Sequence, residues 1–358
     1  MRLLILLLVL SSALCGIGQI EFEHGGLTRT YFMDAPDPIP AGAPLVFVLH
    51  GYSSSAALIR AYSNWDELAL SEGFVAIFPQ GTSDSGGTSH WNANLGISTT
   101  NDHGFLVELA QHLQEAHGLS PECTYSCGMS NGGFMSYSLA CEHPEVFRAI
   151  GSVTGAMSDQ DFGCIPTEVV PVVHLHGTAD NTVSYDNGVG FGNWGNAGVT
   201  DIIDHWTDLM GTTTIEESAL PNVELVDLTS VDFMRYAGAP GGQEFHHYRV
   251  NGGGHVWFGA WGSPDVASTQ VLWDFFSAQC SGEFTDVTEA SPPEPWLTPQ
   301  GKGFRVQRDA QVRVFDASGR MIMRKNMANG EVWTPNLPQI YVVQAVDTHG
   351  EIQVLKGR

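Results

Sequence analysis

A G-x-S-x-G pattern at residues 128–132 is the strongest sign of chemistry in the sequence. It follows a short apolar run at 124–128 and precedes a helix-like stretch at 132–142. A serine on a tight turn between a strand and a helix lifts its hydroxyl above the sheet, where it can attack a carbonyl carbon. The pattern therefore predicts Ser130 as the nucleophile of an acyl transfer. The alternative is an ordinary tight turn in a glycine-rich chain.

A serine nucleophile needs a general base, and the base needs a carboxylate that orients it. Downstream of Ser130, Asp180 follows the apolar run 170–175, and His255 lies in a glycine-rich segment after the run 245–250. The chain order Ser, Asp, His is typical of α/β-hydrolases, whose sites lie at the carboxyl ends of strands. Taken singly, Asp180 could cap a helix and His255 could be an ordinary loop residue. Together they predict a catalytic triad.

Two backbone N–H groups, those of Tyr52 and Asn131, are predicted to form the oxyanion hole. Tyr52 lies just past the apolar run 45–49, in the segment His50-Gly51-Tyr52, and Asn131 directly follows the nucleophile. Each such donor typically lowers the barrier by ~3 kcal/mol.

Several tryptophans near these segments could line a cleft for the substrate. Aromatic rings offer large apolar faces that suit aromatic or sugar-linked acyl esters. The alternative is that two or three of them are core residues. The predicted substrate-binding residues are Trp91, Trp194, Trp257 and Trp261.

Short apolar runs alternate with longer amphipathic stretches over most of the chain. This pattern predicts an α/β fold, a doubly wound and mostly parallel sheet covered by helices on both faces. Residues 21–33 are expected to form an antiparallel edge hairpin. The predicted strands are 45–49, 74–78, 124–128, 149–153, 170–175 and 245–250, and the predicted helices are 58–71, 105–117, 132–142, 201–210 and 266–279.

The 358 residues divide into four segments. Residues 1–18, a basic start followed by an apolar run too short to span a bilayer, predict a cleaved signal peptide. Residues 19–283 are predicted to be the catalytic domain, and the proline-rich residues 284–301 a linker. Residues 302–358 read as short strands between turns and predict a small all-β domain.

Charge separates these segments and excludes one class of partner. The 15 basic and 39 acidic residues give a net charge of −24, and such a surface repels nucleic acid. Residues 1–301 contain six arginines and no lysine and carry −28, whereas residues 302–358 contain nine basic residues and carry +4. The 43% hydrophobic content also excludes wholesale disorder.

Export makes disulfides plausible, and five cysteines remain after the signal peptide is removed. An odd number leaves at least one thiol unpaired. The five are Cys123, Cys127, Cys141, Cys164 and Cys280.

Two other functions are compatible with the residue pattern. His174 and His176 alternate on a predicted strand and, with Asp180, could hold zinc in a metal-dependent hydrolase. No second histidine follows Asp180 closely, so we expect neither a metal nor another cofactor. The second is a non-catalytic polysaccharide-binding module, which would require that a member of the triad be missing.

The chain resembles the secreted polyhydroxybutyrate depolymerase and feruloyl/acetylxylan esterase group of α/β-hydrolases. The resemblance implies ester hydrolysis through an acyl-enzyme, with polyester or feruloyl and acetyl polysaccharide esters as substrates. Group members often have a cysteine where this chain has residues 211–213, and a proline where it has Phe258. The first departure fits the odd number of cysteines and leaves the disulfide pairing open, with Cys141–Cys164 as the expected pair. The matching segments are 44–52, 78–81, 101–106, 127–133, 139–141, 176–180 with Val183 and Tyr185, and 252–257.

The carboxyl-terminal segment is similar to the sorting domain of the type IX secretion system of Bacteroidetes. The similarity rests on residues 312–320 and 337–343 and on Lys356. It implies that the tail is recognised by the secretion machinery and that the protein is secreted or held at the cell surface. The alternative for this segment is a small carbohydrate-binding β-sandwich. We expect the protein to be a monomer.

Overall fold

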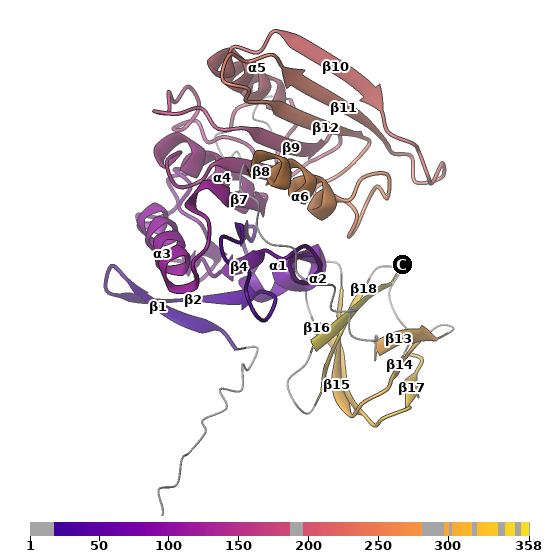
Figure 1. Ribbon diagram of the computed structural model, residues 1–358. Coiled ribbons are helices and arrows are strands. Elements are labelled where there is room, and N and C mark those ends of the chain that lie inside the picture. Colours follow the sequence, from indigo (N-terminus) through magenta and orange to yellow (C-terminus); the bar gives the residue numbers. More distant parts are fainter. Residues whose placement is uncertain are drawn as a thin grey trace, which may run out of the picture.

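The computed structural model describes residues 18–186, 196–280, 297–300, 303–316, 321–335, 341–347 and 352–357 (Figure 1). The predicted signal peptide lies outside the described residues except for Gly18, and so does the predicted linker up to residue 296. Within the described part of the chain, no helix is long and apolar enough to cross a membrane.

A ten-stranded sheet forms the centre of the larger domain, in the order β1-β2-β4-β3-β7-β8-β9-β12-β11-β10. The six strands from β4 to β12 in this order run parallel, and antiparallel pairs close both edges. The predicted α/β fold is confirmed. The strands are β1 Ile20–His24, β2 Leu27–Asp34, β3 Leu45–Leu49, β4 Val75–Pro79, β7 Thr124–Met129, β8 Ala149–Val153, β9 Val172–Gly177, β10 Thr214–Ala219, β11 Ser230–Ala237 and β12 Phe245–Asn251.

In the described part of the chain, six α-helices cover the two faces of this sheet, where five were predicted. Residues 58–71 are not one helix, because Asn64 takes the left-handed conformation (φ 61°) and ends α1 where α2 begins. Asparagine adopts this conformation more readily than most residues. The helices are α1 Ala56–Ser63, α2 Trp65–Glu72, α3 Asp102–His117, α4 Asn131–Glu142, α5 Val199–Met210 and α6 Ser268–Gln279; the short elements are β5 Thr82–Ser83, β6 Ser89–His90 and the 3-10 helix Pro121–Cys123.

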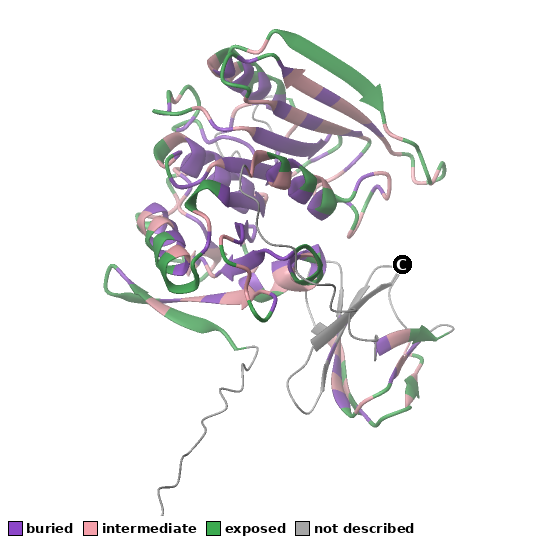
Figure 2. Ribbon diagram, viewed as in Figure 1, coloured by how far each residue is buried: buried purple, intermediate pink, exposed green. Residues whose placement is uncertain are grey.

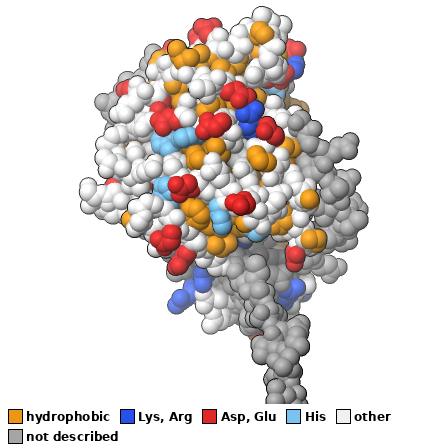
Figure 3. Space-filling view, turned by 60° about the vertical axis from the view of Figure 1, so that its left-hand side comes forward, with side chains coloured by type: hydrophobic (Ala, Val, Ile, Leu, Met, Phe, Trp, Pro, Cys, Tyr) orange, Lys and Arg blue, Asp and Glu red, His pale blue; other side chains and the backbone are white. Residues whose placement is uncertain are grey.

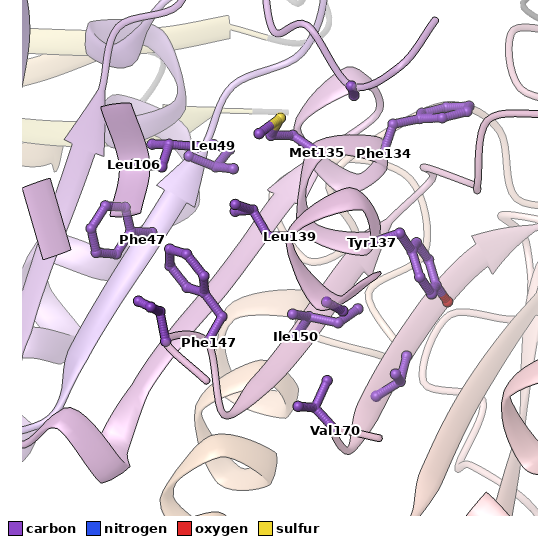
Figure 4. Close-up of a cluster of buried hydrophobic side chains, with 14 of the residues drawn as sticks. Phe47, Leu49, Leu106, Phe134, Met135, Tyr137, Leu139, Phe147, Ile150 and Val170 are labelled. Atoms are coloured by element: carbon purple, nitrogen blue, oxygen red, sulfur yellow. The ribbon is translucent and has the colours of Figure 1, made fainter. Parts of the chain in front are cut away.

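Two hydrophobic cores lie on opposite faces of the sheet. Successive side chains of β3 alternate between them: Leu45, Phe47 and Leu49 face the core with α3, α4 and α5, and Val46 and Val48 face the core with α1, α2 and α6. Figure 4 shows part of the first core, and Figure 2 shows that burial is concentrated on the central strands while β1 and β10 are largely exposed. A strand inside a parallel sheet is buried on both faces, so its sequence is a continuous apolar run. This is why these strands could be predicted from the sequence.

Two disulfides join described residues of the larger domain. Cys141–Cys164 is the expected pair, and Cys123–Cys280 links the 3-10 helix before β7 to the residue that follows α6. Cys127 is a buried free thiol on β7.

The carboxyl-terminal domain is all-β, as predicted, but it begins before residue 302. Leu297–Gln300, assigned to the linker in the sequence prediction, forms β13 and pairs with β14. Two sheets, β13-β14-β17 and β16-β15-β18-β19, share one small core. The strands are β13 Leu297–Gln300, β14 Gly303–Val306, β15 Ala310–Asp316, β16 Met321–Met327, β17 Val332–Trp333, β18 Tyr341–Asp347 and β19 Ile352–Gly357.

Acidic side chains are scattered over the face of the larger domain shown in Figure 3, with few basic ones among them. This agrees with the net charge of −28 carried by residues 1–301. Such a surface repels anionic polymers and anionic membranes.

Candidate active site

Ser130 lies at the turn between β7 and α4 in a strained backbone conformation. Its φ of 54° and ψ of −121° fall in a region that non-glycine residues rarely adopt, at a typical cost of ~1–3 kcal/mol. Its N–H donates to the carbonyl oxygen of Val153 on β8 at 2.9 Å, so the neighbouring strand holds the strained residue in place. The turn therefore has the geometry predicted for a nucleophile.

The glycines on either side of Ser130 are required by close backbone approach. A Cβ on Gly128 would lie 2.6 Å from the carbonyl oxygen of Leu49, and a Cβ on Gly132 would lie 2.1 Å from the same atom. Real Cβ atoms do not approach backbone so closely, so only glycine lets β3, β7 and α4 converge beneath the nucleophile.

Asp180 and His255 are hydrogen-bonded to each other. The Asp180 side chain is buried in the turn after β9, where its Oδ1 accepts the N–H groups of Thr182 (2.8 Å) and Val183 (3.0 Å). Its Oδ2 accepts from Nδ1 of His255 at 2.7 Å. Because an ionised carboxylate only accepts, the proton lies on Nδ1, and Nε2 of His255 is left to accept a proton.

A cavity of about 270 Å³ brings the nucleophile and the histidine together. The predicted oxyanion-hole residues Tyr52 and Asn131 line the same cavity, so the four residues converge although they lie far apart in the sequence. Apolar side chains that the sequence did not single out form much of the wall. The lining residues are Tyr52, Ser53, Leu95, Ser130, Asn131, Phe134, Thr182, Val183 and His255.

A histidine that sequence reasoning missed fixes the loop at residues 50–52, here called the oxyanion loop because it carries the predicted oxyanion-hole residue Tyr52. His50 is fully buried, its Nδ1–H donates to the carbonyl oxygen of Gly51 (2.8 Å), and its Nε2 accepts the N–H of Gly81 (3.0 Å). Burial lowers the pKa of His50 to about 4, so the ring is neutral and its tautomer is set by these two bonds. A Cβ on Gly51 would lie 3.4 Å from Cβ of Ser130, which shows how closely this loop approaches the nucleophile.

The side chain of Asn131 has a second role that the sequence did not reveal. Its Oδ1 accepts the N–H of Trp91 (2.6 Å) and its Nδ2 donates to the carbonyl oxygen of Trp91 (3.1 Å). The indole N–H of Trp91 donates in turn to the carbonyl oxygen of His50 (3.0 Å). These bonds tie the start of α4 to the oxyanion loop through Trp91.

Two of the four predicted substrate-binding tryptophans are instead core residues. Trp91 is fully buried and Trp257 is 1% exposed, and the indole N–H of Trp257 donates to Oγ1 of Thr269 (3.0 Å). Neither ring offers a face to a substrate, and the prediction is wrong for both. Trp261 is half-buried with its ring 4.8 Å from that of Tyr62, and Trp194 lies outside the described residues.

The residues suggested for a zinc site do not fit a metal. Nε2 of His174 lies 3.0 Å from Nδ1 of His176, Nδ1 of His174 accepts from Tyr137, and Nε2 of His176 donates to the carbonyl oxygen of Val183. Every ring nitrogen is therefore engaged within the protein. Among the described residues, no group of three potential ligands is placed to hold a metal ion.

Buried histidines predict that the fold is sensitive to acid. Burial lowers the pKa of His50 to about 4 and of His247 to about 3, and it also lowers the pKa of His174 and of His176. An unfolded histidine titrates near pH ~6.5, so below that pH the unfolded state binds more protons. As far as these histidines are concerned, the free energy of unfolding is therefore highest above pH ~6.5. Below that pH it decreases by ~1.4 kcal/mol per pH unit for each histidine. Burial raises the pKa of Asp66 to about 6, which opposes this trend by one proton.

Urea unfolding measured from about pH 7.5 to about pH 4.5 tests this expectation. The control is His247→Leu, which removes one of the buried rings and should make the pH dependence shallower by ~1.4 kcal/mol per pH unit. Stability that does not change between about pH 6.5 and pH 5 would contradict the account.

Comparison with known proteins points to esterases. Residues 35–191 match the family model described as "Esterase PHB depolymerase". The putative esterase NocK of Nocardia uniformis subsp. tsuyamanensis is 30% identical over 46% of this chain and 49% of its own length. Poly(3-hydroxyalkanoate) depolymerase C of Paucimonas lemoignei is 29% identical over 42% of this chain and 37% of its own length. The chain thus spans about half or less of these curated relatives.

A solved structure shares the fold of the larger domain. Acetyl xylan esterase from Aspergillus awamori superposes with a TM-score of 0.50 at 14% identity, over 70% of this chain and 94% of that one. The strained turn at Ser130, here called the elbow, is consistent with the match over residues 35–191 and with this shared fold. Residues 35–191 are thus similar to the PHB depolymerase family of esterases, and the larger domain has the α/β fold of a solved esterase.

Proposed function

We propose that this protein is a serine carboxylic-ester hydrolase that works through an acyl-enzyme and needs no cofactor. The observation that carries the proposal is the convergence on one cavity of Ser130, on a strained elbow, and His255, oriented by Asp180. A non-catalytic module would need none of this strain or orientation. The family match and the esterases among the relatives support the same reaction class.

In the first half-reaction, Oγ of Ser130 attacks the ester carbonyl carbon while Nε2 of His255 takes the hydroxyl proton. Negative charge develops on the carbonyl oxygen, and the N–H groups of Tyr52 and Asn131 stabilise it. The bond from carbon to the alcohol oxygen then breaks, and His255 returns its proton to the leaving alcohol. The acyl group remains on Ser130.

In the second half-reaction, water replaces the alcohol and follows the same route in reverse. His255 takes a proton from the water, the oxygen attacks the acyl carbon, and the bond to Oγ of Ser130 breaks. The proton returns to Ser130 and the carboxylic acid leaves. Asp180 keeps the proton of His255 on Nδ1 and stabilises the imidazolium in both halves.

An exposed apolar loop favours an aliphatic polyester as the substrate. Val223, Leu225, Val226 and Leu228 are between 67% and 87% exposed in the loop from β10 to β11. The loop lies against the segment that carries the catalytic histidine, since a Cβ on Gly252 would be 2.6 Å from the carbonyl oxygen of Leu228. Aliphatic side chains beside an active site suit an uncharged apolar solid.

The walls of the cavity and the fate of the tryptophans support the same choice. Leu95, Phe134 and Val183 give the cavity an apolar lining. Trp91 and Trp257, which could have served as platforms for sugar or feruloyl rings, are buried in the core. A polyester of the hydroxybutyrate type is therefore the proposed substrate, with feruloyl and acetyl polysaccharide esters as the competing outcome.

A substrate panel tests the proposal: p-nitrophenyl acetate, methyl ferulate, acetylated xylan and a hydroxybutyrate polyester, each with and without an organophosphonate. We expect inhibitor-sensitive hydrolysis of the first and the last. Inhibitor-sensitive hydrolysis confined to ferulate or xylan would overturn the substrate class and leave the mechanism standing. Hydrolysis that the inhibitor does not affect would overturn the mechanism.

The triple substitution Leu225→Ser, Val226→Ser and Leu228→Ser separates adsorption from chemistry. Each aliphatic side chain that is buried against a solid contributes ~1.5–3 kcal/mol, so hydrolysis of a polyester film should fall at least ~100-fold while that of p-nitrophenyl acetate stays unchanged. The matched control is Ile165→Ser, because Ile165 is 82% exposed elsewhere on the domain. Equal losses on both substrates would contradict a role in adsorption.

We also propose that the protein is secreted or displayed at the cell surface, with residues 302–358 recognised by the secretion machinery. The two disulfides support an oxidising compartment. Fusion of this segment to a reporter and measurement of the reporter outside the cell tests the role of the tail. A reporter retained inside the cell would contradict it.

A further inference from the structure

Three histidines are buried beneath the active site, and the mechanism above uses none of them. His174 and His176 lie on β9 and His247 lies on the neighbouring strand β12, all fully buried. A polar ring buried in a sheet is costly unless its nitrogens are hydrogen-bonded. The partners of these rings therefore indicate what the rings do.

The hydrogen bonds of His174 and His176 on β9 form a series in which every donor points the same way, here called the hydrogen-bond chain. This hydrogen-bond chain ends at the carbonyl oxygen of Val183, which can only accept, so Nε2 of His176 carries the proton of that 2.9 Å bond. Nδ1 of His176 must then accept from Nε2–H of His174 (3.0 Å), and Nδ1 of His174 must accept from the hydroxyl of Tyr137 (2.7 Å). One carbonyl group thus fixes the tautomers of both rings.

Burial keeps every member of this chain in its neutral form. It lowers the pKa of His174 and of His176 and raises the pKa of Tyr137 well above its usual range. The side chains that face His176 are those of Asp180, His174, His255 and Tyr185. The chain therefore supplies oriented hydrogen bonds and no net charge.

The hydrogen-bond chain ends at the turn that carries Asp180, the proposed catalytic acid. Nε2 of His176 lies 2.9 Å from the carbonyl oxygen of Val183 and 3.5 Å from Oδ2 of Asp180. This Oδ2 is the atom that accepts from His255, and the N–H of Val183 donates to the other carboxylate oxygen. His176 thus contacts both ends of the turn from Asp180 to Val183.

We propose that His176, oriented by His174 and Tyr137, is a positioning residue that holds Asp180 where its Oδ2 accepts from His255. Without the donor on His176, the turn loses the bond at Val183, and the carboxylate can rotate away from Nδ1 of His255. The inference rests on the proposed function, because it assigns Asp180 the role of the catalytic acid.

His247 offers a matched control. It is as buried as His176, its Nε2 accepts the hydroxyl of Tyr185 (2.8 Å), and its Nδ1–H donates to the carbonyl oxygen of His174 (3.0 Å). No hydrogen bond joins it to the turn from Asp180 to Val183 among the bonds described for these residues. Replacing His247 should therefore lower the stability of the protein but leave the position of Asp180 unchanged.

The kinetic test compares His176→Leu, His176→Gln and His247→Leu in the full chain with p-nitrophenyl acetate. His176→Leu should lower kcat ~10- to 100-fold with KM unchanged, the size of loss found when a hydrogen-bond partner that orients a functional side chain is removed. The amide of His176→Gln places a donor close to the site of Nε2 and should restore kcat to within ~10-fold of wild type. His247→Leu should lower the thermal midpoint as much as His176→Leu but keep kcat within ~2-fold.

A second readout does not depend on turnover. The proton between His255 and Asp180 should give a low-field NMR resonance in the wild type and in His247→Leu, and the resonance should be lost in His176→Leu. If the wild type hydrolyses no ester, the proposed function fails and this resonance alone decides the positioning role. A resonance that persists in His176→Leu would overturn the inference, and so would equal kcat losses in His176→Leu and His247→Leu.

If His176→Leu does not fold, a milder pair of variants gives the answer. Tyr137→Phe removes the hydroxyl that orients His174, and Tyr185→Phe removes the equivalent hydroxyl from His247. A fall in kcat and a shifted His255 resonance in Tyr137→Phe alone support the chain. The same behaviour in both variants, or wild-type behaviour in Tyr137→Phe, would contradict it.

Discussion

Ser130→Ala is expected to lower kcat by a factor of ~10⁶ and to leave the protein folded. The variant removes the atom proposed to form the acyl-enzyme, while the cavity, the Asp180–His255 bond and the cores should be unchanged. Stability should not fall and can rise, although alanine at φ 54° keeps the backbone strain of the elbow. The measurement is the steady-state hydrolysis of p-nitrophenyl acetate, with circular dichroism to confirm the fold.

The matched control for this variant is Ser136→Ala on α4, the helix that follows Ser130. Ser136 is fully buried, its hydroxyl donates to the carbonyl oxygen of Gly132 (3.0 Å), and it does not line the cavity. Its loss should cost about 1 kcal/mol of stability and leave turnover within about twofold. Substantial activity in Ser130→Ala, or an equal loss in both variants, would show that another group is the nucleophile.

Asp180→Asn is expected to lower kcat by a factor of ~10⁴ with little change in KM. The amide nitrogen would face Nδ1 of His255 as a donor, and the ring would place its proton on Nε2. That nitrogen then cannot accept the proton of Ser130, and the imidazolium loses the carboxylate that stabilises it.

The pH–rate profile and a matched control variant test this explanation. Because the wrong tautomer blocks proton transfer, raising the pH should not restore the turnover of Asp180→Asn. Asp161→Asn is the control, since Asp161 is buried in a separate hydrogen-bond cluster with Ser158 and Asn94. A small loss in Asp180→Asn, comparable to that in Asp161→Asn, would contradict the triad.

The sequence predicted the elements and residues whose physical signal is local. The parallel strands are continuous apolar runs because they are buried on both faces, and the elbow at Ser130 is set by a pattern of five residues. Asp180 and His255 were found because they follow strands whose carboxyl ends meet at one edge of the sheet. Their roles in catalysis remain predictions for the variants above to test.

What the sequence missed depends on contacts between distant segments. Trp91 and Trp257 look like cleft residues until their indole N–H groups find partners at His50 and Thr269 inside the fold. Strand β10 is exposed along its whole length, so it has no buried face to produce an apolar alternation. The tautomers of His50 and His176, on which the role proposed for His176 depends, are determined only by hydrogen-bond partners in the structure.

Reaction with an organophosphonate followed by mass spectrometry of the intact protein and its peptides tests the central claim most directly. The account predicts one covalent adduct per chain, located on Ser130, with activity lost in proportion to labelling and no adduct in Ser130→Ala. An adduct on a different residue, or full activity in the labelled protein, would contradict it.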